Sequence, residues 1–78
     1  MYVYLLYSLK DPKQCYVGCT ENIRQRLMRH NNGDVPHTSK FKPWKFSLVI
    51  WFDDERKAWN FEKYLKTGSG QAFRKRHF

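Results

Sequence analysis

Glu62 is the residue whose chemistry stands out in this sequence, because it is a carboxylate within an apolar stripe. Ala58, Phe61, Glu62 and Leu65 follow one another at i, i+3, i+4 and i+7, which is the spacing of one helix face. A carboxylate is costly to remove from water, so it needs a partner in such a place. Either Glu62 lies at the edge of the stripe and pairs with Lys66, or its oxygens bind a hard divalent cation.

A second set of polar residues lies in the first third of the chain. Arg26 and His30 are four residues apart and would project together from one helix, where both could reach a phosphate oxygen. Tyr4 and Tyr16 lie inside strand-like runs, and Gly18 shares the face of Tyr16. Since glycine in a strand often marks a close approach, these residues could form a floor that is open to phosphate. Each feature alone also fits a solvated helix face or ordinary strand packing.

The charge balance favours a polyanionic partner. Fifteen Lys and Arg against seven Asp and Glu give a net charge of +8, which promotes phosphate contact through counterion release. The basic residues form two candidate nucleic-acid-binding segments: Lys40, Lys42 and Lys45 around Trp44, and Arg74, Lys75 and Arg76. A second tryptophan, Trp51, is expected in the core because of its strand context.

The cysteines and histidines offer a zinc-binding interpretation. Cys15, Cys19, His30 and His37 carry the ligand types that zinc prefers. The spacing of the two cysteines is not that of a zinc knuckle, and one strand would hold the thiols apart, so small buried thiols are the favoured interpretation. No apolar run approaches the ~18 residues that span a bilayer. A cytoplasmic protein without a membrane partner is expected.

The first half of the chain predicts a hairpin followed by a helix. The aromatic and aliphatic runs at 2–9 and 14–20 are separated by a polar loop with Pro12, which favours antiparallel pairing. Asn22 is expected to cap a helix that runs to about His30. These elements would carry the two tyrosines and the Arg and His pair.

The second half predicts one more strand and two helices. Residues 46–52 are nearly continuous in apolar character, so this strand is expected to be central in the sheet. The acids at 53–55 would cap the next helix, Gly68 would end it, and Ser69 would cap a closing helix. The expected fold is a single α+β domain over residues 1–78, with a three-stranded mostly antiparallel sheet flanked by helices in the order β-β-α-β-α-α.

These residues together resemble the signature of the GIY-YIG nuclease superfamily over nearly the whole chain. The two named motifs correspond to Tyr2-Val3-Tyr4 and Tyr16-Val17-Gly18, with Arg26 and His30 following in register. The helix with Glu62 resembles the acidic helix of that family, and residues 66–70 resemble the ending of its compact stand-alone bacterial members. These are related to the N-terminal domain of the excision-repair nuclease C subunit.

The sequence departs from that signature at three positions. Tyr2 stands where glycine is named, Val3 replaces isoleucine, and Cys19 occupies a position that carries lysine in some relatives. The first two changes are common in strands, whereas the third alters the local charge.

The resemblance implies a divalent-metal-dependent endonuclease that hydrolyses a DNA phosphodiester bond. It implies that Tyr4 is the general base, assisted by Tyr16 or His30, that Arg26 neutralises phosphate charge, and that Glu62 holds Mg²⁺ or Mn²⁺. The ordinary phenol pKa of about 10 would have to be lowered for this role. Single- or double-stranded DNA is the implied partner, with RNA as an alternative and a larger DNA-repair complex as a further one.

Two other functions stay open on the sequence alone. The first is a catalytically silent nucleic-acid-binding module with the same fold, which would bind in a salt-sensitive way without cutting. The second is a small metal-bound structural protein, which would require Cys15 and Cys19 to ligate zinc.

Overall fold

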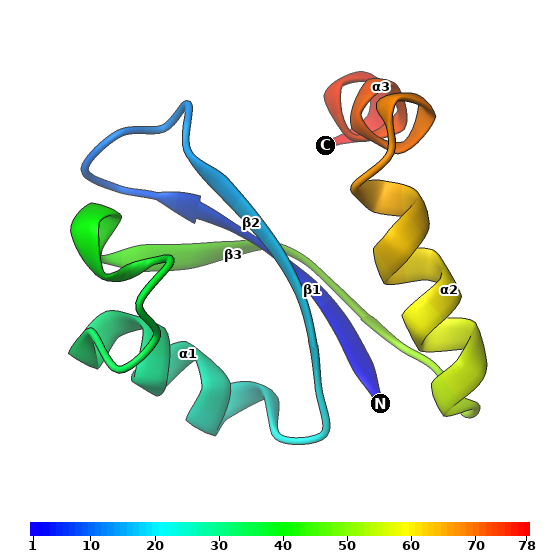
Figure 1. Cartoon of the computed structure of the whole chain (residues 1–78), viewed down its shortest axis with the longest axis horizontal. Helices are drawn as coiled ribbons and strands as arrows, with labels where there is room; N and C mark the ends of the chain where they lie inside the picture. The colour runs from blue at the N-terminus through cyan, green and yellow to red at the C-terminus, as the bar shows by residue number, and fades with distance from the viewer.

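A three-stranded antiparallel sheet forms the centre of the computed structural model, which describes residues 1–78 (Figure 1). Its strands are β1 (Tyr2–Ser8), β2 (Cys15–Thr20) and β3 (Trp44–Trp51), in the spatial order β2-β1-β3. The other elements follow in this order: α1 (Ile23–Asn32), the 3₁₀ turn η1 (Ser39–Phe41), α2 (Glu55–Leu65) and α3 (Gly68–His77). The predicted α+β class and element order are confirmed.

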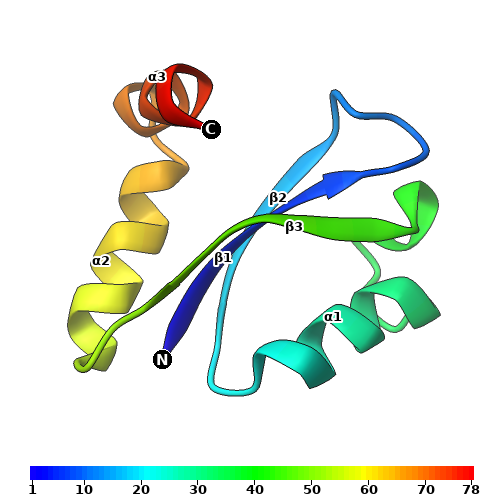
Figure 2. The same ribbon diagram turned by 180° about the vertical axis from the view of Figure 1, so that it is seen from behind.

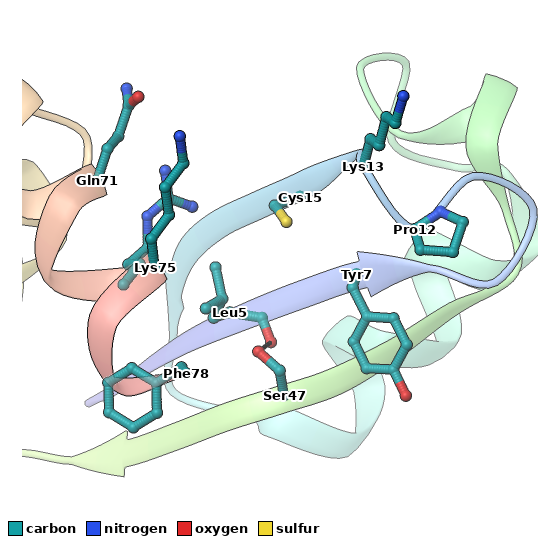
Figure 3. Close-up of a pocket in the computed structure, with 10 residues that line it drawn as sticks. Leu5, Tyr7, Pro12, Lys13, Cys15, Ser47, Gln71, Lys75 and Phe78 are labelled. Atoms are coloured by element: carbon teal, nitrogen blue, oxygen red, sulfur yellow. Dashed lines mark hydrogen bonds between the residues drawn. The ribbon is translucent and has the colours of Figure 1, made fainter.

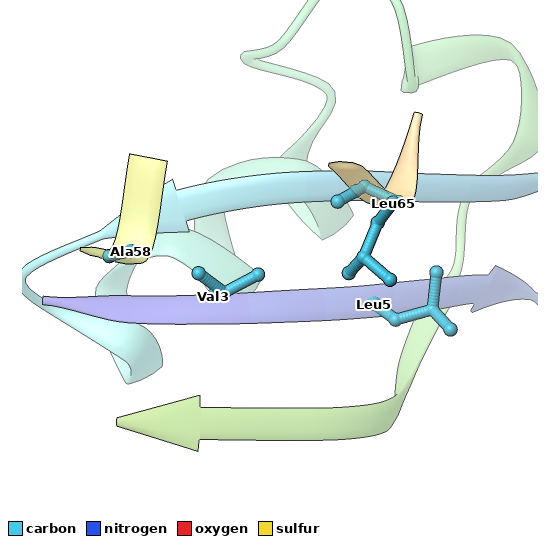
Figure 4. Packing of buried hydrophobic residues seen from close by; sticks show 5 residues of the cluster. Val3, Leu5, Ala58 and Leu65 are labelled. Carbon is cyan, nitrogen blue, oxygen red and sulfur yellow. The ribbon is translucent and has the colours of Figure 1, made fainter. Parts of the chain in front are cut away.

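Helices cover both faces of the sheet, as the two opposite views show (Figures 1 and 2). Alternation along β1 sends Val3 and Leu5 to one face, where they pack with Ala58 and Leu65 of α2 (Figure 4). The other face carries a second core cluster, which comprises Tyr4, Leu6 and Trp44 and packs against Ile23 and Leu27 of α1. β1 is therefore buried on both sides. None of the helices is long and apolar enough to cross a membrane.

The central strand is β1, so the prediction that the third strand would be central is wrong. β1 pairs with both other strands, whereas β3 lies at an edge, and its side chains alternate between covered and exposed. Val49 and Trp51 stay uncovered, with Trp51 61% exposed. The expectation that Trp51 is core is wrong for the same reason. An apolar run does not reveal whether both of its faces are covered.

The first helix begins and ends as its sequence predicts. The Asn22 side chain accepts a hydrogen bond from the backbone N–H of Gln25, and Gly33 ends the helix in the left-handed region at φ 81°. The helix continues to Asn32, two residues beyond the expected end.

The boundary between α2 and α3 differs from the prediction. Asp54 caps α2 as expected, but the helix ends at Leu65, and Gly68 is the first residue of α3. Thr67, and not Ser69, caps α3, because its hydroxyl accepts from the backbone N–H of Gly70 at 3.1 Å. Threonine and serine are both good capping residues, so the local sequence does not decide between Thr67 and Ser69.

Candidate active site

Tyr4 lies at the centre of a polar group on the α1 face of the sheet. It stands directly opposite Gly18 of β2, and a Cβ at position 18 would overlap the Tyr4 phenol. Tyr4 is only 1% exposed. Gly18 therefore makes room for the tyrosine ring, and the floor that was expected to be open to phosphate is filled by this ring.

A chain of hydrogen bonds runs from α1 through Tyr4 to the loop before β3. Arg26 Nε–H donates to Tyr4 Oη at 3.3 Å, and Tyr4 Oη lies 2.9 Å from His30 Nε2. His30 Nδ1 lies 2.7 Å from Thr38 Oγ1, which donates to the Val35 carbonyl at 3.3 Å. His30 is 0% exposed and Thr38 1%. The chain thus brings together three of the predicted site residues in a water-excluded place.

The donors and acceptors of this chain fix the tautomer of His30. Because the Thr38 hydroxyl hydrogen goes to the Val35 carbonyl, Thr38 Oγ1 accepts from His30 Nδ1–H. Nε2 then offers its lone pair to the Tyr4 hydroxyl. The opposite tautomer would leave the hydroxyl hydrogen of buried Tyr4 without an acceptor, which is costly. His30 is therefore a neutral imidazole aimed at the Tyr4 proton.

Burial sets the protonation states of this group. Burial raises the pKa of Tyr4, and the hydrogen bond from Arg26 opposes this only in part. Burial, followed by the charges of Arg26 and Arg29, lowers the pKa of His30 from 6.5 to about 4. The hydrogen bond to Tyr4 raises the pKa of Arg26, so its charge is permanent. The direction for Tyr4 is opposite to the lowering that a general base requires.

Tyr16 faces the same group from the edge strand β2. Its ring centroid lies 5.0 Å from that of His30 and 6.3 Å from that of Tyr4. Tyr16 and Arg26 are both half-buried, in contrast to fully buried Tyr4. A ligand that approaches this face therefore meets Tyr16 and Arg26 before it meets Tyr4.

Glu62 lies on α2, which covers the face of the sheet opposite to Tyr4. Its side chain is 22% exposed, and the carboxylate lies 3.5 Å from Lys66 Nζ. The pair with Lys66 is the first of the two alternatives that the sequence leaves open for Glu62. The charge of Glu62 helps to raise the pKa of Tyr4, and it adds to the burial that raises the pKa of Cys19 to about 11. Glu62 is thus within electrostatic reach of both residues.

The donor set near Glu62 fits a hard cation that substrate helps to hold. No group of three or more His, Cys, Asp and Glu side chains lies close enough together to hold a metal ion by itself. Mg²⁺ is commonly held by one or two carboxylates, waters and substrate phosphates, so a single carboxylate suits it. Both cysteines are free thiols, with Cys15 exposed. The zinc-bound structural interpretation therefore has no ligand set.

The structure does not gather the predicted basic residues at Tyr4. Lys40 and Lys42 are exposed in and just after η1, whereas Arg74, Lys75 and Arg76 lie on α3, beyond α2 (Figure 1). Trp44, expected beside the lysines at the surface, is only 4% exposed. Its indole N–H donates to the Thr38 carbonyl at 2.8 Å, so it supports the loop that holds His30.

Thr38 is the functional residue that the sequence did not indicate. It lies between α1 and η1, and nothing in its local pattern distinguishes it from Thr20 or Thr67. Its hydrogen bond joins it to His30, eight residues earlier in the chain, and its carbonyl accepts from the indole of Trp44. Neither contact is visible in the local sequence.

Comparison with known proteins identifies the family of this chain. The model of the GIY-YIG catalytic domain matches residues 1–76. The chain belongs to the GIY-YIG family. The resemblance of its motifs is thereby confirmed, and nucleases of this family generally depend on a divalent metal ion.

Relatives in the family include proteins from fungi and bacteria. The chain is 38% identical over 71 residues to the structure-specific endonuclease subunit SLX1 of Debaryomyces hansenii, covering 82% of the chain and 20% of that protein. It is 37% identical to the SLX1 subunit of Yarrowia lipolytica, covering 82% of the chain and 25% of that protein. A UPF0213 protein of Clostridium perfringens is 36% identical, with 83% of the chain and 69% of the relative covered.

The chain spans a fifth to a quarter of the length of these two SLX1 relatives and about two thirds of the Clostridium protein. No solved structure matches the chain.

Proposed function

We propose that this GIY-YIG domain is a divalent-metal-dependent endonuclease that hydrolyses a DNA phosphodiester bond. The observation that carries the proposal is the buried hydrogen-bond chain from Arg26 through Tyr4 to His30, within electrostatic reach of Glu62. A permanent cation, a phenol and an imidazole with a free lone pair supply charge neutralisation and a path for one proton.

Tyr4 and His30 would act as one general base. As a water attacks the phosphorus, its proton moves to Tyr4 Oη, and the hydroxyl proton of Tyr4 moves to His30 Nε2 along the 2.9 Å hydrogen bond. His30 becomes an imidazolium, the bond from phosphorus to the leaving oxygen breaks, and the leaving oxygen takes up a proton from solvent water. This relay avoids a free tyrosinate, which the raised pKa of Tyr4 disfavours.

Arg26 and Tyr16 would bind and orient the phosphate. Both are half-buried and lie against Tyr4, and Arg26 keeps its charge. A fixed cation beside the developing negative charge stabilises the transition state more than the ground state. Gly18 contributes by letting the Tyr4 ring take its place in this group.

Glu62 would hold the Mg²⁺ or Mn²⁺ ion. When bound, such an ion supplies Lewis-acid stabilisation of the leaving oxygen. The only cation that the carboxylate now contacts is Lys66, and that pair is partly exposed and easily exchanged.

DNA is the proposed substrate because of the charge of the chain and the names of its relatives. A net charge of +8 favours polyanions, and the two SLX1 relatives are described as structure-specific endonuclease subunits. We therefore propose that branched or partly single-stranded DNA is cut better than a plain duplex. Because both relatives are endonuclease subunits, we also propose that this chain acts within a larger complex.

A cleavage assay with matched variants tests this function. End-labelled single-stranded, duplex and branched DNA, and RNA, are incubated with the protein in Mg²⁺, in Mn²⁺ and in chelator. Wild type is expected to cut DNA only with metal. Arg26→Ala and Tyr4→Phe should each lose about 100-fold or more of the rate, as loss of a transition-state contact commonly does. Glu62→Gln should lose metal-dependent cleavage.

The controls come from the same helices. Arg24→Ala on α1 and Glu55→Gln on α2 remove exposed side chains of the same charge and should leave the rate nearly unchanged. Cleavage in chelator, or full cleavage by the folded Glu62→Gln variant, would overturn the proposal.

A silent nucleic-acid-binding module is the second candidate, and one observation favours it. Burial lowers the pKa of His30 to about 4, which makes its imidazole a weak acceptor for the proton that the relay would deliver. This candidate is expected to bind DNA with strong salt dependence and to release no product with any metal or substrate in the panel.

A further inference from the structure

A cavity lies on the sheet face that points away from Tyr4. Its volume is about 520 Å³, and it opens between α3 and the hairpin of β1 and β2 (Figure 3). Leu5 of β1 and Ser47 of β3 form its floor, and Cys15 of β2 lies on one wall. Because neighbouring residues of a strand point to opposite faces, Leu5 and Tyr4 place this cavity and the candidate active site on opposite sides of one sheet.

The cavity combines cationic and aromatic side chains. Lys13 from the hairpin loop and Arg74 and Lys75 from α3 line it, and no acidic residue does. Tyr7 and Phe78 contribute aromatic rings to its walls. An anionic ligand with a flat, partly apolar body has the complementary chemistry.

Arg74 has one polar atom that the protein leaves unpaired. Its Nε is buried and has no hydrogen-bond partner in the protein. The dipole of α3 accounts for cations in its last turn, because they face the free carbonyl groups there. It does not account for a buried donor without an acceptor, since such groups are nearly always paired. The Nε atom itself is covered, so an anion in the cavity would contact other atoms of this half-buried side chain.

We propose that this cavity is a nucleotide-binding site, with the phosphate held by Arg74 and Lys75 of α3 and the base held against Tyr7 at the hairpin end, where Lys13 also lies (Figure 3). Cavities of roughly 300 to 1,000 Å³ are usual for small-molecule sites, and this volume lies within that range. Aromatic side chains stack on any base, while a guanidinium and an ammonium group suit a phosphate. The nucleotide is either free or one unit of a strand that passes over this face.

The site does not depend on the nuclease function. Its residues belong to the opposite sheet face and to α3, and none of them is in the Arg26, Tyr4 and His30 chain. Binding can therefore be measured in chelator, where no cleavage occurs, and the two proposals can fail separately.

The rate at which Cys15 is alkylated can report nucleotide binding in the cavity. It is exposed and lines the cavity, whereas the other thiol, Cys19, is half-buried with its pKa raised to about 11, which leaves little reactive thiolate near neutral pH. Alkylation of Cys15 is followed by mass spectrometry with deoxyadenosine 5′-monophosphate, deoxyadenosine, inorganic phosphate or an end-blocked oligodeoxyadenylate. At a mononucleotide concentration about ten times Kd, the rate should fall about tenfold, because only the free fraction reacts.

The comparison of probes tests the chemical class. Stronger protection by the mononucleotide than by the nucleoside or by phosphate supports the proposal. Protection by the oligonucleotide as well assigns the site to a strand, whereas its absence assigns the site to a free nucleotide. Equal protection by inorganic phosphate would overturn the nucleotide assignment.

A comparison of variants tests whether the nucleotide binds in this cavity. Arg74→Gln and Lys75→Glu should abolish protection, and Arg76→Glu, a charge reversal on the same helix outside this cavity, should lose much less of it than Lys75→Glu. Arg26→Ala should keep it, because that residue belongs to the other face. Absence of protection in wild type, or unchanged protection in both Arg74→Gln and Lys75→Glu, would overturn the site.

Discussion

Tyr4 Oη lies 2.9 Å from Nε2 of His30, and the two side chains are 1% and 0% exposed. The pair joins the central strand to α1 at a point where almost none of either side chain is open to solvent in the free protein. In such surroundings an unpaired donor is costly, so each group enforces the protonation state of the other. The same burial that fixes the geometry also keeps the proton on Tyr4. The proposed relay starts from these protonation states, with the proton on Tyr4 and His30 neutral.

Replacing Thr38 by Val should loosen this arrangement without changing the shape of the side chain. The substitution removes the oxygen that accepts from His30 Nδ1–H, which leaves a buried donor unpaired and should cost about 1 to 3 kcal/mol of unfolding free energy. Nitrogen NMR of the imidazole should show that Nδ1 stays protonated, because Tyr4 still needs Nε2 as its acceptor, but that the Nδ1 resonance shifts once its own acceptor is gone. Thr38→Ser keeps the hydroxyl and should keep the Nδ1 resonance in place. An unchanged imidazole spectrum in Thr38→Val would contradict the hydrogen-bond chain.

Stability should fall as the pH falls from 6.5 to about 4, owing to His30. The folded protein lowers the pKa of His30 from 6.5 to about 4, so in this range the unfolded chain binds a proton that the folded one does not. Stabilisation is complete above pH 6.5 and decreases toward pH 4, by roughly 3 kcal/mol in total at 1.36 kcal/mol per pKa unit. Urea unfolding at several pH values measures this slope. His30→Gln should remove most of it, whereas exposed His37→Gln should retain it.

Gly18→Ala should displace Tyr4, because the new Cβ would overlap the phenol ring. Overpacking of this kind typically costs about 1 to 3 kcal/mol. The variant should unfold at lower urea and should lose cleavage together with the Tyr4 to His30 contact. Gly68→Ala is the matched control, since a Cβ there meets nothing within 4 Å. A Gly18→Ala protein as stable as wild type would show that the Tyr4 ring can move without cost, which would contradict the tight packing of Tyr4 against Gly18.

The elements were predictable because local signals agreed with the final packing. Asn22 and Gly33 mark the ends of α1 by side-chain capping and by positive φ, which are properties of single residues. The central position of β1 was not predictable, because β1 and β3 are both rich in apolar residues. Their difference lies in which helices cover them, and this is decided only when the chain folds.

The candidate site was predictable only in part. Tyr4, Arg26 and His30 lie in one hydrogen-bond chain, as their register with the family signature suggested. The burial of Tyr4 opposite Gly18 and the support from Thr38 were not visible, because both depend on contacts between separate elements. The two tryptophans exchange their expected places for the same reason, with Trp44 buried and Trp51 exposed.

Trp51 should contribute to nucleic-acid binding and little to stability. It pairs with Tyr2 across β1 and β3, and Tyr2 is two residues from Tyr4, so Trp51 lies on the sheet face of the candidate site. An exposed indole there can stack on a base, which is worth about 1 to 3 kcal/mol, or roughly 5- to 150-fold in Kd. Fluorescence anisotropy with a labelled single-stranded oligonucleotide in chelator should show this weakening for Trp51→Ala.

Trp59→Ala is the comparison that separates this effect from a general loss of aromatic surface. Trp59 is 48% exposed on α2, close to the 61% of Trp51, but it lies on a helix that covers the other face of the sheet. Both variants should unfold at nearly the wild-type urea concentration, because mostly exposed side chains contribute little to the core. Only Trp51→Ala should weaken binding. Equal loss of affinity in the two variants would place the bound strand elsewhere on the molecule.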